Sequence, residues 1–148
     1  MIEKAINNIL VNDALLIAAF AGGTPEVYFG INPEVNSSKY LIFYRNSTEP
    51  YDTKNGNATT APNGRSTLDS VDIQINLYST SALECADLAE RTRTILDRKS
   101  GTFAGVVLQS VQFTNQSSMF EFDIEYNEKG VYQISQYFKC RVTPQYNN

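Results

Sequence analysis

Residues 68–99, LDSVDIQINLYSTSALECADLAERTRTILDRK, contain the two clearest secondary-structure patterns of the chain. In the first part of this stretch, apolar and polar side chains alternate with a period of two. This alternation is typical of a strand that has one face on a core and the other face in water. The apolar members are Val71, Ile73, Ile75 and Leu77. The pattern therefore predicts a half-buried strand over residues 71–78.

The period changes to that of a helix after Ser81. The apolar positions that then share one helical face are Cys85, Leu88, Ala89, Thr92, Ile95 and Leu96. Ser81 and Glu84 have the spacing of a capping box, and Gly101 can adopt the left-handed conformation of a C-terminal cap. One strand therefore leads into one amphipathic helix through a short connection, and we expect the rest of the chain to pack around this pair.

Composition excludes several classes of protein. A chain of 148 residues predicts one domain, covering residues 1–148. Its net charge of −4 argues against a free-standing nucleic-acid-binding protein, because phosphate contacts need clustered Lys and Arg. The chain has no histidine, which removes Ser-His and Cys-His nucleophiles and most zinc sites. We therefore expect neither an enzyme nor a bound cofactor or metal.

The two cysteines, Cys85 and Cys140, both lie on apolar faces of their predicted elements. Buried thiols are the expected state, and a disulfide is the alternative.

Four acidic residues form a cluster that could in principle carry chemistry: Glu121, Asp123, Glu125 and Glu128. Three of them alternate along a strand pattern, so the expected role is a solvated face. A cation site is one alternative, but the glycine and terminal glutamate of an EF-hand are missing. A glycosidase carboxylate pair is another, and the chain offers no tryptophan as a sugar platform.

The flanking segments complete the predicted fold. Residues 2–20 predict a helix that is interrupted at Asn12 and Asp13, where Asp13 can cap a second short helix. Further strands are expected over residues 27–30, 40–45, 105–113, 119–126 and 131–142, with turns at 115–118 and 127–130. A structured acidic loop is the alternative for residues 119–126. This order predicts an α+β fold, in which two helices pack on one face of a mainly antiparallel sheet.

Residues 46–67 contain almost no apolar side chain. Loops of more than about 15 residues inside compact domains are usually functional or disordered. We expect an arm that becomes ordered against a partner, with a solvated loop as the alternative. The C-terminal tail, residues 144–148, is a second candidate arm. The candidate assembly contacts in these two segments are Tyr51, Lys54, Asn55, Arg65 and Tyr146.

The order of five segments carries a resemblance to a known family. The segments are NDAL (12–15), VYFG (27–30), YLIFY (40–44), SVDIQINLYS (70–79) and ALECADLAERTRTIL (82–96). They are followed by two more strand segments. The chain resembles the tail-terminator or tail-completion family of long-tailed bacteriophages, small proteins similar to the lambda tail terminator and head–tail joining proteins.

The resemblance implies a structural virion protein of the tail or neck, made in the host cytoplasm. It implies a homo-oligomeric ring, expected to be a hexamer, that caps the tail tube and contacts neck or connector proteins. In such a ring DNA passes through without sequence-specific binding, and no membrane is involved. The long polar loop would then contact the tube or a neighbouring subunit.

Two other functions stay open. One is a head–tail connector or head-closure ring of the neck. The other is a small secreted binding module, in which the first 21 residues would be removed as a signal. No segment is long and apolar enough to be expected to cross a membrane as a helix.

Overall fold

The computed structural model describes residues 2–30, 38–50, 68–123 and 127–144, without the side chains of residues 121–123 and 127–129. The helices in this part are α1 (Ile2–Asn12), α2 (Ala14–Ile17) and α3 (Ala82–Leu96). The strands are β1 (Val27–Phe29), β2 (Lys39–Pro50), β3 (Asp69–Ser79), β4 (Gly101–Phe103), β5 (Val106–Asp123) and β6 (Asn127–Val142).

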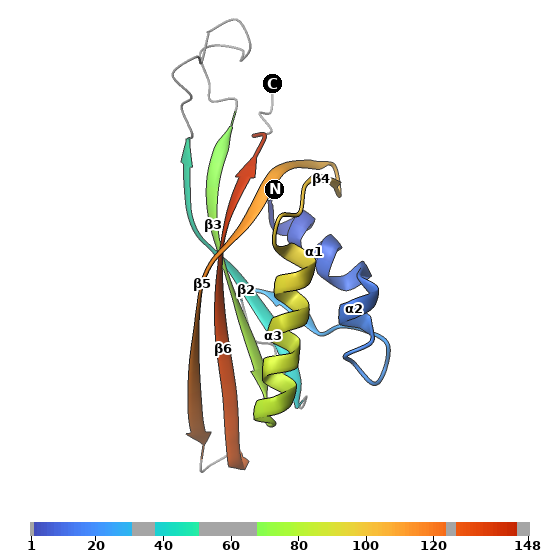
Figure 1. Cartoon of the computed structure of the whole chain (residues 1–148), viewed down its shortest axis with the longest axis vertical. Coiled ribbons are helices and arrows are strands. Elements are labelled where there is room, and N and C mark those ends of the chain that lie inside the picture. Colours follow the sequence, from blue (N-terminus) through green and yellow to red (C-terminus); the bar gives the residue numbers. More distant parts are fainter. Residues whose placement is uncertain (1, 31–37, 51–67, 124–126, 145–148) are drawn as a thin grey trace, which may run out of the picture.

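The strands form one six-stranded sheet in the order β1-β2-β3-β6-β5-β4. β1 runs parallel to β2, and the other neighbouring pairs are antiparallel. Figure 1 shows that the long strands twist strongly along their length, so the sheet is curled into a half-barrel. The same figure shows α1, α2 and α3 grouped on one side of it.

The predicted α+β fold, with two helices on one face of a mainly antiparallel sheet, is wrong. The described chain is mostly sheet, the sheet is mixed and curled, and the helices are three and short. One local feature caused the error in the sheet. The alternation of a strand shows which residues face the core, but it does not show the direction of the neighbouring strand, and β1 pairs parallel to β2. The predicted break at Asp13 is confirmed, and it divides the N-terminal segment into α1 and α2, so the described helices number three.

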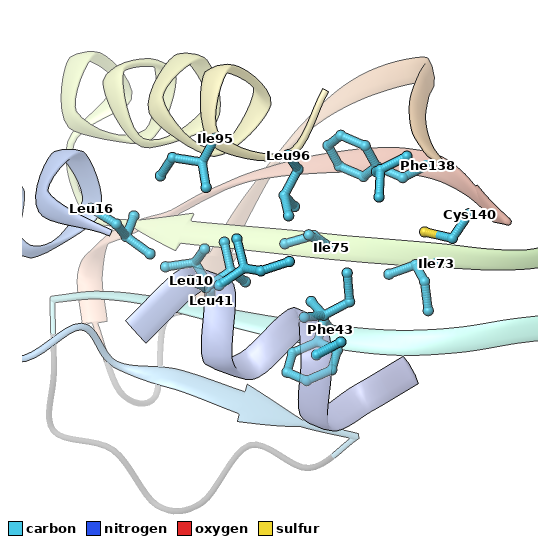
Figure 2. Packing of buried hydrophobic residues seen from close by; sticks show 14 of the residues in the cluster. Leu10, Leu16, Leu41, Phe43, Ile73, Ile75, Ile95, Leu96, Phe138 and Cys140 are labelled. Carbon is cyan, nitrogen blue, oxygen red and sulfur yellow. The ribbon is translucent and has the colours of Figure 1, made fainter. Parts of the chain in front are cut away.

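One hydrophobic core lies between the helices and the sheet. The predicted apolar residues of β3 and the apolar face of α3 are all buried in it. Figure 2 shows Leu10, Leu41, Ile75, Leu96 and Phe138 directed into this interior from different elements. β3 therefore lines the core from the sheet side, and α3 lines it from the helix side.

Side-chain caps define where two helices begin. Asp13 has an extended backbone and its carboxylate accepts the Leu15 N–H at 2.9 Å. Ser81 Oγ accepts the Glu84 N–H at 3.4 Å, as predicted. The reciprocal half of the capping box is replaced, because the Ser81 N–H donates to Ser79 Oγ at 3.1 Å.

The C-terminal end of α3 differs from the prediction. The residue that follows α3 with a left-handed backbone is Arg98, at φ 65°, whereas Gly101, at φ 132°, lies further on in β4. The Arg98 N–H donates to Val111 O of β5 at 2.7 Å, so a contact with a distant strand holds this turn.

Three strand boundaries also differ from the prediction. β2 continues to Pro50, so residues 46–50 of the expected arm are strand. β5 runs through residues 115–118, where a turn was predicted, and β6 already begins at Asn127. The physical reason is the same in each case: these polar segments carry little hydrophobic alternation, and hydrogen bonds to a neighbouring strand hold them extended.

Candidate interaction surfaces

The five assembly contacts expected from the sequence lie outside the described residues. They are Tyr51, Lys54, Asn55, Arg65 and Tyr146, and their role stays a prediction. Glu125 of the acidic cluster also lies outside, and the side chains of the other three members are not described. Within the described ranges, no group of three or more His, Cys, Asp or Glu residues could hold a metal ion.

Among the described residues, no helix combines the length and the apolar character that a membrane span requires.

The middle of the sheet surface opposite the core forms a neutral face. The strand registers place three consecutive outward positions of β2, β3 and β6 in rows beside one another. We call this set the outer face; it consists of Tyr40, Ile42, Tyr44, Gln74, Asn76, Tyr78, Gln133, Ser135 and Tyr137. Four of its nine residues are tyrosines, and most of the other five are polar. None of the nine is charged.

A connected network of hydrogen bonds holds the polar side chains of the outer face. The Asn46 amide donates to Gln74 Oε1 at 3.1 Å, and Gln74 Nε2 donates to Asn76 Oδ1 at 2.9 Å. Asn76 Oδ1 also accepts Ser135 Oγ at 2.8 Å, and Asn76 Nδ2 donates to the Tyr78 hydroxyl at 3.4 Å. The network crosses three strands, so these groups are fixed in position before any partner binds.

Four half-buried tyrosines lie on the outer face. The rings of Tyr40 and Tyr78 stack with centroids 4.8 Å apart. Ile42, Asn76 and Ser135 are 3%, 7% and 7% exposed, so the half-buried tyrosines and glutamines provide the contact area that a partner can reach. Tyrosine is enriched at protein interfaces, and a neutral, rigid, tyrosine-bearing face is suited to binding another protein.

A second surface is the open edge of β5. β4 pairs only with residues 106–108 of β5. Beyond it, the connection after α3 bonds to the edge, where Asp97 Oδ1 accepts the Phe113 N–H at 3.0 Å. Every residue from 114 to 120 is exposed, including Met119 at 53% and Phe120 at 48%. The Phe120 ring lies 4.6 Å from the ring of Tyr132, centroid to centroid.

Neither surface was singled out from the sequence, although signals for both were present. The polar side of residues 71–78 has amides where an ordinary solvated strand has mostly charges. Residues 106–120 contain no charged residue at all. Only the pairing of strands that are distant in sequence shows that the polar residues of 71–78 belong to a continuous face and that β5 has an open edge.

The two thiols are buried, as predicted, and they are not joined in a disulfide. The Cys85 thiol donates to Leu77 O at 3.4 Å. Burial raises the pKa of Cys85, and burial together with the nearby Asp72 carboxylate raises the pKa of Cys140 to about 12. Both groups are therefore neutral and shielded at neutral pH, and they act as core residues.

Comparison with known proteins bears on the fold. No protein-family model matches the chain, and no curated protein matches it. A chain in the solved structure titled "Virion of native gene transfer agent (GTA) particle" matches it with a TM-score of 0.64. The two sequences are 18% identical, and the match covers 95% of this chain and 92% of that chain. The two proteins therefore share a fold over nearly their full lengths.

Proposed function

We propose that this protein is a structural subunit of a phage-like virion, and that it forms the ring that terminates the tail tube. The observation that carries the virion role is the fold shared with a chain of the gene transfer agent particle over 95% of this chain. The terminator position rests on the resemblance of the element order to the tail-terminator family. The alternative within the same particle is a connector or head-closure ring of the neck.

A ring subunit needs two different surfaces that meet head to tail. The outer face supplies one: it is neutral, hydrogen-bonded and rich in tyrosine. The opposite, helical side carries Leu15 and Leu83, which are 45% and 84% exposed. We propose that the outer face of one subunit contacts the helical side of the next, and about 800 Å² per partner is enough for such a contact.

The net charge of −4 suits a ring through which DNA passes, because like charges weaken contact with the phosphate backbone. The proposal assigns no catalysis to the protein. That it is neither an enzyme nor a cofactor-binding protein stays a prediction, as do the hexameric ring and the partners in the tube and neck.

The test is assembly of the purified protein, alone and mixed with tail tubes, followed by native mass spectrometry and electron microscopy. The wild-type chain is expected to form a ring that sits at tube ends. Gln133→Arg, which puts a charge into the outer face, is expected to weaken the ring at least about tenfold. Gln109→Arg, at an exposed position of β5 outside the outer face, is the matched control and should assemble normally.

Two outcomes would count against the proposal. A wild-type chain that stays monomeric at every concentration and binds neither tubes nor necks would overturn it. Rings found only between the head and the neck would move the protein to the connector position.

A further inference from the structure

The two long edges of the sheet are protected very differently. Beyond its contact with β1, the edge of β2 carries Arg45, a bulge between Arg45 and Ser47, Glu49 and Pro50. Charges, bulges and proline are the usual means of preventing a strand edge from pairing with another chain. Residues 106–120 of β5 contain no charge and no proline, and β5 pairs with β6 without a register shift from Asn115 to Glu121. This part of β5 is a regular, unprotected edge.

The backbone groups that face this edge can be assigned from hydrogen bonds. The Phe113 N–H bonds to Asp97, so it points away from β6. A bulge between Phe113 and Asn115 shifts the alternation by one residue. Accordingly, the Gln116 N–H donates to Asn115 Oδ1 at 2.7 Å. By alternation, the N–H and C=O groups of Gln116, Ser118 and Phe120 face the open edge.

We propose that residues 115–120 of β5 pair antiparallel with the same segment of a second copy of this chain, about a two-fold axis at Ser118. Ser118 would exchange both backbone hydrogen bonds with Ser118 of the partner subunit, and Gln116 would do so with Phe120 of the partner subunit after its N–H leaves Asn115 Oδ1. Such a contact is isologous and closes as a dimer.

The properties of the other strand edges favour a second copy of β5 as the strand that pairs with this edge. The β2 edge has no backbone donor at Pro50 and carries two charges, so it is a poor partner strand. The outer edges of β1 and β4 are three residues long. Among the described strands, the β5 edge itself offers the best match in length and in lack of charge.

The surroundings of the edge agree with this pairing. Figure 1 shows the lower half of β5 at the border of the sheet, with no other described element beyond it. Pairing would place the partner's Gln116 beside Phe120, where it would cover part of the exposed ring. The inference goes beyond the proposed ring, because this two-fold contact uses a surface different from the outer face.

The first experiment measures the dimer dissociation constant by sedimentation equilibrium. Ser118→Pro removes the outward N–H without removing a bond to β6, and it is expected to raise the dissociation constant at least roughly tenfold. Thr48→Pro is the matched control: Thr48 lies two residues before the natural Pro50 on the protected β2 edge. It should leave the dimer unchanged, and chemical denaturation should show both variants folded.

Two oppositely charged variants at Ser118 test the two-fold axis itself. They also decide whether the β5 edges pair if Ser118→Pro does not fold. Ser118→Lys and Ser118→Glu should each be monomeric, because like charges face each other across the axis. Mixing the two should restore a dimer. Charged variants that dimerise like the wild type, or a mixture no more dimeric than its components, would overturn the pairing.

The two proposals fail separately. A wild-type chain that forms rings or binds tubes, with Ser118→Pro doing so equally well and no dimer present, would remove the edge pairing and leave the virion role. A wild-type dimer that needs the β5 edge but never joins tubes or necks would remove the terminator role and leave the pairing.

Discussion

At the scale of single residues, Gln136 shows how a polar side chain can organise the core. It is fully buried on β6, facing the helices. Its Nε2 donates to Ala89 O of α3 at 2.7 Å and to Gln116 Oε1 of β5 at 3.0 Å. A buried amide destabilises a fold unless it is hydrogen-bonded, and here the Nε2 group is bonded while Oε1 has no partner among the described residues. Gln136 therefore favours one position of α3 and β5 relative to β6.

The Cys140 thiol predicts a specific dependence of stability on pH. Its pKa rises from 9.0 to about 12 on folding, so the thiol contributes full stability below pH 9. As the pH rises from 9 towards 12, the unfolded chain releases this proton and the folded chain keeps it, so the free energy of unfolding falls. Between pH 9 and 10, the wild type should lose roughly 1 kcal/mol more than Cys140→Val.

Urea denaturation at several pH values measures this difference, and the valine variant corrects for Lys and Tyr titration. An equal loss of stability with pH in the two proteins would contradict the assignment.

In the native protein, both thiols should stay unreactive towards a thiol reagent until the chain unfolds, because both are buried.

At the scale of elements, the strand and helix of residues 69–96 form a unit that local interactions define. β3 buries one face by alternation, and Ser81 ends the connection by capping α3. β5 is the opposite case. Residues 114–118 are all polar, and their strand conformation depends on pairing with β6 and on the bulges that adjust its register.

Removal of the α3 cap should destabilise the fold by a modest amount. Ser81→Ala loses the acceptor for the Glu84 N–H, and we expect the free energy of unfolding to fall by about 1 kcal/mol. Ser81→Asp keeps an acceptor at this position and is the control, expected within about 0.5 kcal/mol of the wild type. Chemical denaturation monitored by circular dichroism measures both, and an alanine variant as stable as the aspartate variant would refute the role of the cap.

At the scale of the whole molecule, α1 and α2 are part of the core. Leu10 and Leu16 are fully buried, and they belong to the same hydrophobic cluster as residues of β2 and β3. Cleavage after residue 21 would remove both helices and open the core.

Two adjacent leucines of α2 test this integration. Leu16→Ala creates a cavity at a fully buried site and should lower the free energy of unfolding by about 2–5 kcal/mol. Leu15→Ala removes a side chain that is 45% exposed and should cost less than about 1 kcal/mol. If urea denaturation gave similar values for the two variants, α2 would not be packed as described.

The sequence alone determined the strand at 71–78, the helix at 82–96, the break at Asp13 and the burial of both thiols. Each of these depends on a local period or on a cap within a few residues, so the pattern is complete in the printed chain. The tertiary structure decided the parallel pairing of β1, the length of β5, the outer face and the open edge. These depend on which distant strands become neighbours and in which register. Because hydrogen bonds between strands are nearly independent of side-chain type, the polar sequence of residues 114–118 gives little indication of its pairing.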